Sequence, residues 1–159
     1  MEELPESLKT VKVTAPTGID AEAFKNCLDI ENIILPDTLE EMGEMAFYGC
    51  TSLKSVNISG LVTEISKGAF IGCENLKITV PSAVTAINRE AFKNCTNLKI
   101  TLSEGLLYIG CIAFYNCTYL KDFIFEGTRK EWEAIEKEKG WDNYVGRGEH
   151  TVHCSDDAE

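Results

Sequence analysis

The apolar residues of this chain follow a pattern that returns every 22 or 23 residues. Each unit contains two alternating apolar residues, a turn, a second apolar pair, and then Ala-Phe with a Cys three residues after the Phe. A fixed period in the low twenties predicts a solenoid, in which each unit is one coil that packs on its two neighbours. The diagnostic triplets are Ala23-Phe24-Cys27, Ala46-Phe47-Cys50, Ala69-Phe70-Cys73, Ala91-Phe92-Cys95 and Ala113-Phe114-Cys117.

The alternating apolar pairs predict one strand in each coil. Because residues two apart on a strand share a face, these side chains point inward, and six such strands stack in parallel about 4.8 Å apart. The second apolar pair, such as Leu39 and Met42, predicts a shorter strand that closes the coil from the other side. The inward pairs are Val11 and Val13, Ile33 and Leu35, Val56 and Ile58, Ile78 and Val80, Ile100 and Leu102, and Phe123 and Phe125.

The Ala-Phe segments predict a single helical or 3₁₀ turn with the Phe inside, since residues three apart then fall on one face. A Gly or Asn precedes each repeated Cys, and these residues tolerate the reversal of the chain that follows. The two 22-residue repeats each lack one residue between the Leu after the Cys and the first strand residue. Lys77 and Lys99 are therefore expected to align with Ser55.

The chemistry of the chain changes after the last repeat. Thr128 and Glu131 have the spacing of a capping box, which predicts a helix from about Arg129 to Glu138 that stops at Gly140. A terminal coil needs a cover for its core and for its strand edge. We expect this helix, together with the strand-like segment at residues 151–153, to provide that cover.

Composition and charge exclude several classes of partner. The formal net charge of −11 and the pI of about 4.7 argue against nucleic acid, because phosphate contacts need clustered Lys and Arg. No apolar stretch is long enough to span a membrane, so we expect no membrane insertion. The first residues, MEELPESL, have neither the basic nor the hydrophobic region of a signal peptide.

The cysteines and histidines do not suggest catalysis. Five of the seven cysteines occupy one position of the repeat and no CxxC pair occurs, which favours small buried thiols over disulfides or zinc ligands. Cys111 is placed at the repeat position of Gly43 and Ser66. His150 and His153 lie outside the repeats, and His153 and Cys154 would point to opposite faces of a strand. We therefore expect no enzyme, no catalytic or metal site, and no cofactor.

The repeat unit resembles a known family. Written as Leu-x-x-Val-x-Ile-(Pro/Ser)-x-x-Leu-x-x-Ile-x-x-x-Ala-Phe-x-(Gly/Asn)-Cys-x-x-Leu, it is similar to the BspA-like, or Treponema pallidum-type, leucine-rich repeats, and the match covers roughly Leu8 to Phe125. The resemblance implies a surface or secreted protein of a host-associated bacterium or protist, with adhesion as a frequent role. Since the chain shows no signal peptide, a cytoplasmic location stays open. The family supplies no catalytic residues.

The resemblance also implies the architecture. The expected fold is α/β: a right-handed leucine-rich-repeat solenoid with a parallel concave β-sheet, short helical turns on the other side, and a C-terminal cap that contains a helix. We expect an irregular N-terminal edge at residues 1–7, a solenoid of about five coils at residues 8–126, and a cap and tail at residues 127–159. The under-capped N-terminal edge allows a monomer or weak end-to-end self-association.

The outward residues of the concave strands are not needed for packing, so they are available for recognition. One hypothesis is that this face binds an extended protein or glycan partner, with Lys12, Lys77 and Lys99 favouring acidic groups. The alternative is a structural spacer without a ligand, in which Thr and Asn merely suit a solvated sheet. The first column reads Thr10, Asn32, Ser55, Lys77, Lys99 and Asp122, and the second reads Lys12, Ile34, Asn57, Thr79, Thr101 and Ile124.

Overall fold

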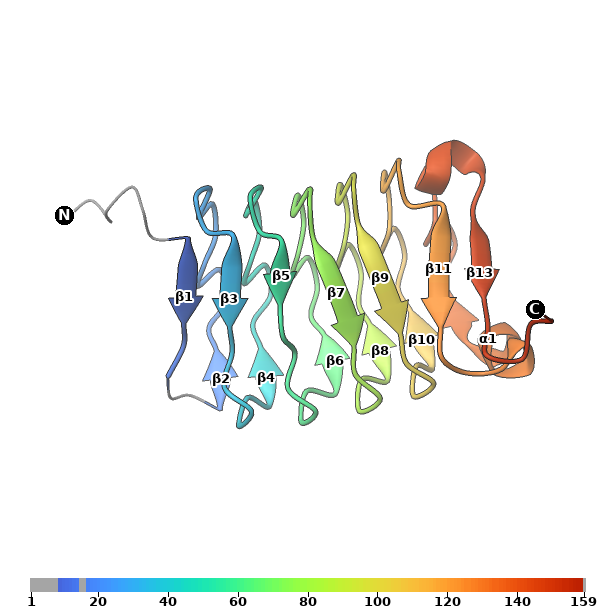
Figure 1. Ribbon diagram of the computed structural model, residues 1–159, viewed down its shortest axis with the longest axis horizontal. Helices are drawn as coiled ribbons and strands as arrows, with labels where there is room; N and C mark the ends of the chain where they lie inside the picture. Colours follow the sequence, from blue (N-terminus) through green and yellow to red (C-terminus); the bar gives the residue numbers. More distant parts are fainter. Residues whose placement is uncertain (1–8, 15–16, 159) are drawn as a thin grey trace.

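The chain forms a solenoid whose coils advance along one axis (Figure 1). The computed structural model describes residues 9–14 and 17–158, so the expected irregular edge at residues 1–7 lies outside these residues. Six parallel strands were predicted on the concave face, and the sheet has a seventh, which comes from the tail. In spatial order its strands are β1 (Thr10–Lys12), β3 (Asn32–Ile34), β5 (Ser55–Val56), β7 (Lys77–Val80), β9 (Lys99–Leu102), β11 (Asp122–Phe125) and β13 (Thr151–His153).

The predicted second strand of each coil is also present. Short parallel strands form a four-stranded sheet in the order β12-β10-β8-β6, and β2 pairs with β4 at the N-terminal end. The register confirms the expected alignment, because Ser55 lies opposite Lys77, and Lys77 lies opposite Lys99. The bounds are β2 (Gly18–Ile19), β4 (Glu41–Met42), β6 (Glu64–Ile65), β8 (Ala86–Ile87), β10 (Tyr108–Ile109) and β12 (Glu136–Lys137).

The Ala-Phe segments differ from the expected helical turns. They are successive turns closed by hydrogen bonds such as Ala46 N–H to Gly43 C=O at 3.3 Å and Tyr48 N–H to Met45 C=O at 3.0 Å. Met45 has a φ of 54°, in the left-handed region, so a right-handed helix cannot pass through it. The expected reversal before each repeated Cys is confirmed, since positive φ angles occur at Asn26, Gly49, Gly72, Asn94 and Asn116.

Two ladders run through the core along the solenoid axis. The rings of Phe24, Phe47, Phe70, Phe92 and Phe114 stack with centroid separations of 5.2–5.4 Å and interplanar angles of 5–9°. Beside them, each thiol of the repeated cysteines from the second coil onward donates to the Phe carbonyl of the preceding coil at 3.0–3.2 Å. All seven cysteines are free thiols, which agrees with the expectation for the five repeated ones.

The placement of Cys111 was wrong by one residue. The N–H of Gly110 donates to the carbonyl of Ile87 in the preceding coil at 2.8 Å, and the N–H of Gly43 makes the same bond to the coil before it. Gly110, and not Cys111, is therefore equivalent to Gly43. Cys111 instead accepts from the N–H of Glu90, as Lys67 accepts from Met45. It therefore occupies a half-exposed position at which other coils carry charged residues.

The C-terminal helix is shorter than predicted. α1 spans Arg129–Ala134, and the capping box at Thr128 and Glu131 is present. The chain then turns into β12, where the N–H of Glu136 donates to Leu107 C=O at 3.0 Å. This pairing satisfies the edge of the second sheet, which a helix continuing to Glu138 would leave open. The tail continues through η1 (Val145–Gly148), a 3₁₀ segment interrupted by positive φ angles, into β13.

Candidate binding face

The predicted outward residues lie in two columns on the concave sheet. The strand pairings place Thr10 opposite Asn32 and Lys12 opposite Ile34, and Ile124 opposite Thr101 at the other end. β13 extends both columns, because Thr151 lies opposite Asp122, and His153 lies opposite Ile124. The sequence predicted a strand in this segment but not its place in the two columns. Its polar-apolar-polar alternation, Thr-Val-His, was the signal that it continues the same sheet.

In the N-terminal half of the face, polar side chains form hydrogen bonds to the neighbouring coil. The Ser55 hydroxyl donates to Asn32 Oδ1 at 2.7 Å. The Asn57 carboxamide makes two hydrogen bonds to the backbone of Leu35, at 2.8 and 2.9 Å, and so satisfies groups just beyond the end of strand β3. These side chains hold adjacent coils together, which leaves fewer polar groups there for a ligand.

The basic residues that flank this half are paired as well. Glu31 accepts Lys54 Nζ at 2.7 Å and Lys9 Nζ at 3.0 Å. The hydrogen bond from Lys54, and then that from Lys9, lowers the pKa of the Glu31 carboxyl from its usual range. Lys9 and Lys54 are thus paired within the protein, whereas Lys12 is exposed and no carboxylate of the described residues lies within 4.0 Å of its ammonium group.

The C-terminal half of the face has unbalanced positive charge. Lys77 and Lys99 are exposed, and no carboxylate of the described residues lies within 4.0 Å of either ammonium group. A hollow of about 430 Å³ adjoins them, with Thr101, Tyr119 and Ile124 among its lining residues. The Tyr119 ring is 57% exposed and Ile124 is 51% exposed, so the hollow offers apolar contact beside the two lysines.

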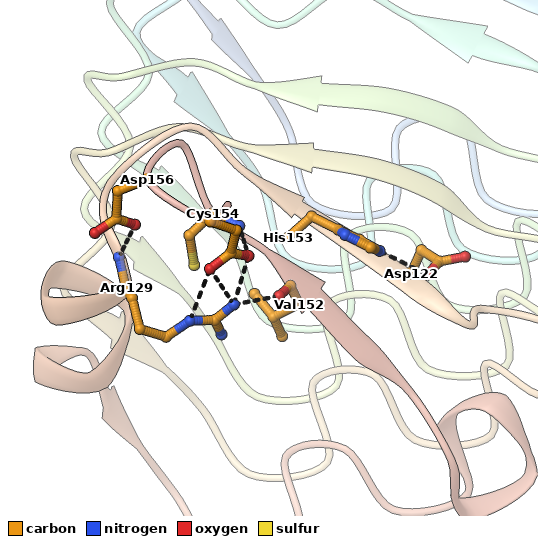
Figure 2. A network of polar contacts seen from close by, with 7 residues as sticks. Asp122, Arg129, Val152, His153, Cys154 and Asp156 are labelled. Carbon is orange, nitrogen blue, oxygen red and sulfur yellow. Dashed lines mark hydrogen bonds and ion pairs between the residues drawn. The ribbon is translucent and has the colours of Figure 1, made fainter. Parts of the chain in front are cut away.

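Residues of the cap contact two of the residues that line this hollow, Tyr119 and Asp122. The Arg147 guanidinium lies 5.2 Å from the centre of the Tyr119 ring, and its Nη2 donates to the Tyr119 hydroxyl at 3.3 Å. His153 Nε2 lies 2.8 Å from Asp122 Oδ1, so the acidic residue of the first column faces a partner from the tail (Figure 2). Tyr119 and Arg147 were not predicted as site residues, because they lie 28 residues apart and no repeat position relates the loop of Tyr119 to η1.

Figure 2 also shows a clasp between the tail and α1. The Arg129 guanidinium binds Asp157 at 2.6 Å and donates to the carbonyl of Val152 at 2.6 Å, while Arg129 N–H donates to Asp156 Oδ1 at 2.7 Å. The hydrogen bond from Arg129 lowers the pKa of Asp157. Cys154, Asp156 and Asp157 present potential metal-ligating atoms within 4.8 Å of one another, but both carboxylates already hold the tail. We interpret this cluster as structural.

The buried thiols are poor nucleophiles. Burial raises the pKa of Cys50 to about 11 and that of Cys117 to about 12, and it raises the pKa of Cys73 and Cys95 well above the usual value. The thiolate is the reactive form of cysteine, so these side chains stay protonated and inert near neutral pH. Among the described residues, the chain forms no helix with the length and apolarity needed to cross a membrane.

Known proteins resemble this chain in both sequence and fold. The sequence profile described as BspA type leucine rich repeat region matches six copies over residues 17–135. The crystal structure of a leucine rich cell surface protein from Faecalibacterium prausnitzii is similar with a TM-score of 0.79 and 30% identity, over 83% of this chain and 36% of that one. Among curated proteins, none matches.

Two further crystal structures share the fold. The leucine rich repeat protein of T. pallidum has a TM-score of 0.67 and 25% identity, over 73% of this chain and 58% of that one. A leucine-rich repeat protein from Bacteroides ovatus has a TM-score of 0.62 and 22% identity, over 93% of this chain and 42% of that one, and so shows the fold alone. The chain thus spans 36–58% of the length of these three structures.

Proposed function

The chain belongs to the BspA-type leucine-rich repeat family, and from this membership we propose that it is a non-enzymatic interaction module of a bacterial surface or secreted protein. The module binds a host or cell-surface partner through its concave sheet, in the manner of an adhesin. The name of the F. prausnitzii relative, a leucine rich cell surface protein, supports the location. The partner contributes an acidic protein segment, and the site lies in the C-terminal half of the sheet.

The observation that carries this proposal is the pair Lys77 and Lys99. These residues lie directly opposite each other on the neighbouring strands β7 and β9. Like charges at directly opposite positions of a sheet repel each other and lower stability. A carboxylate bound between the two ammonium groups would offset this repulsion and form charge-assisted hydrogen bonds. The exposed Tyr119 ring beside them offers contact area for the rest of the segment.

A binding experiment tests the proposal. The probes are an immobilised glutamate-rich peptide, a glutamine-rich peptide of the same length, and a panel of host matrix proteins and glycans. We expect binding to the acidic peptide, and to one or more matrix proteins, with weaker binding to the glutamine peptide. The double variant Lys77→Glu/Lys99→Glu should lower the affinity more than about tenfold, which corresponds to about 1.4 kcal/mol.

The control is Lys25→Glu/Lys130→Glu, which makes the same charge change away from the concave face. It should bind like the unmodified protein. Equal loss in both double variants would show that net charge alone attracts the probe. If no probe binds, the result supports a structural spacer without a ligand. The Ser55 and Asn57 contacts are consistent with that role, because they show that outward residues can form hydrogen bonds between coils.

A further inference from the structure

Asp122 lies between two side chains that can donate to its carboxylate. Strands β9 and β11 pair with Ile124 opposite Thr101. The same register, continued back by two residues, places Asp122 beside Lys99 in the first column, and both residues line the hollow. On the other side, His153 of β13 brings its Nε2 to 2.8 Å from Asp122 Oδ1 (Figure 2). Asp122 thus has a choice of partner from either side of its strand.

Of these two partners, Asp122 binds the histidine. A carboxylate accepts hydrogen bonds and does not donate them, so the imidazole Nε2 of His153 is the donor in this contact. Lys99 has no carboxylate of the described residues within 4.0 Å of its ammonium group. The tail therefore holds the carboxylate that lies beside Lys99 in the sheet, and the ammonium group of Lys99 stays open to a ligand.

The N-terminal half of the same sheet shows the opposite choice. Glu31 lies one position before the first column, and Lys9 and Lys54 occupy the same position in the neighbouring coils. The Glu31 carboxylate accepts from both ammonium groups, at 3.0 Å from Lys9 and 2.7 Å from Lys54. Here no histidine competes for the carboxylate, and it takes the lysines of both adjacent coils. The contrast indicates what Asp122 would do without its partner from the tail.

We propose that His153 is a positioning residue of the binding face, which holds Asp122 and thereby keeps Lys99 available to a carboxylate of the ligand. This inference rests on the proposed function and deepens it, because it names a residue of the tail that acts on the lysine pair through Asp122. Without His153, the Asp122 carboxylate turns to Lys99 and competes with the ligand for the same ammonium group. Exposed ion pairs are weak, so the competition changes the affinity by a modest factor.

The first measurement needs no ligand. Acetylation by an N-hydroxysuccinimide ester, resolved by peptide mass spectrometry, reports the pairing of each lysine, because a nearby carboxylate favours the protonated amine, which does not react. Lys12 serves as the internal reference, since it is exposed and no carboxylate of the described residues pairs with it. We expect the rate of Lys99 relative to Lys12 to fall about two- to fivefold in His153→Ala.

Three further variants separate positioning from a general effect on the fold. His153→Gln keeps an N–H donor for Asp122 and should keep Lys99 reactive. His153→Ala/Asp122→Asn removes the competing carboxylate and should restore the rate of Lys99, although the histidine is still missing. Thr151→Ala is the matched control, because Thr151 lies directly opposite Asp122 on β13, and it should leave the rate unchanged.

The second measurement is the affinity of the same variants for the glutamate-rich peptide. We expect His153→Ala to bind about two- to fivefold more weakly, and His153→Gln to bind like the unmodified protein. An unchanged rate of Lys99 in His153→Ala, or a slower rate that the added Asp122→Asn does not restore, would overturn the role of His153 whatever the peptide does.

The two measurements together distinguish failure of this inference from failure of the proposed function. Slower labelling of Lys99 with an unchanged peptide affinity overturns the inference, because the pairing of Lys99 would then not matter to the ligand. If no variant binds the peptide while Lys99 labels as expected, the proposed function fails and the effect of His153 on Lys99 stands.

Discussion

The aromatic ladder offers the sharpest test of how the coils hold one another. Phe70 is fully buried, and its ring stacks on Phe47 at 5.2 Å and on Phe92 at 5.3 Å. Phe24 has the same position in the first coil, but it is half-buried and, among the described residues, its ring stacks only on Phe47, at 5.4 Å. The pair of substitutions Phe70→Ala and Phe24→Ala therefore compares an interior position of the ladder with its end.

The two costs differ because only one site leaves an enclosed cavity. A buried Phe→Ala change costs about 3–5 kcal/mol, and each aromatic pair contributes about 0.5–1.5 kcal/mol beyond its buried area. With two pairs lost, Phe70→Ala should fall in the upper part of that range, at about 4–5 kcal/mol. Phe24→Ala loses one pair and half the burial, so about 1.5–2.5 kcal/mol is expected.

Urea denaturation followed by far-UV circular dichroism measures both free energies of unfolding. In a solenoid, each coil is stabilised by its contacts with its neighbours, so the interior change also weakens the coupling between the two halves of the molecule. We expect a lower midpoint for Phe70→Ala and a broader transition, with a smaller m value. Equal losses for the two variants would refute the reasoning, since burial and ring stacking would then not set the cost.

Two further substitutions test contacts outside the ladder. Asn57→Ala should lower the free energy of unfolding by about 1–2 kcal/mol, because Leu35 N–H and C=O lose their side-chain partner, whereas Thr79→Ala on the same face should be nearly neutral in the same urea assay. Asp157 has a folded pKa below its usual value because of Arg129, so its contact stabilises the tail above the ordinary Asp pKa of about 3.9 and is lost as the pH falls through the lowered value. Amide exchange at residues 154–158 should therefore rise in that acidic window, and Arg129→Gln should raise it already at neutral pH; unchanged protection in that variant would contradict the role of the clasp.

The repeat made most of the fold predictable. Because each position of the unit has one packing role in every coil, five copies identified the inward residues and the register of the strands without any three-dimensional information. The missing residue before Ile78 even placed Lys77 opposite Ser55, as the sheet confirms. The Gly or Asn before each Cys was interpreted correctly because only the left-handed region explains that preference.

Two features depended on partners that are distant in the sequence. A spacing of three between inward residues fits one helical turn as well as a series of tight turns, and only the hydrogen bonds to the next coil select the latter. The segment Glu136 to Lys139 has good helix formers, yet pairing of β12 with β10 ends the helix at Ala134. In both places, hydrogen bonds to a neighbouring coil overrode the local propensity.

The candidate site was less predictable for the same reason. Outward positions could be assigned from periodicity, but periodicity does not reveal which outward groups the fold itself uses, such as the carboxamide of Asn57. Nor does it reveal that Arg147 reaches Tyr119, because the cap does not repeat any coil faithfully. Tyr119 and Arg147 thus meet where the repeat gives way to the cap.

The cap therefore has a second role besides covering the core. Strand β13 extends the concave sheet and places His153 beside Asp122, and η1 brings Arg147 over Tyr119. Pairing Asp122 with a tail residue gives it a partner other than the nearby Lys99. Under the proposed function, loss of the cap should weaken the binding of an acidic peptide as well as the fold, because Arg147 would no longer lie over Tyr119. At the junction of sheet and cap the chain departs from its repeat, so this is the part of the concave surface whose side chains the period of the coils does not constrain.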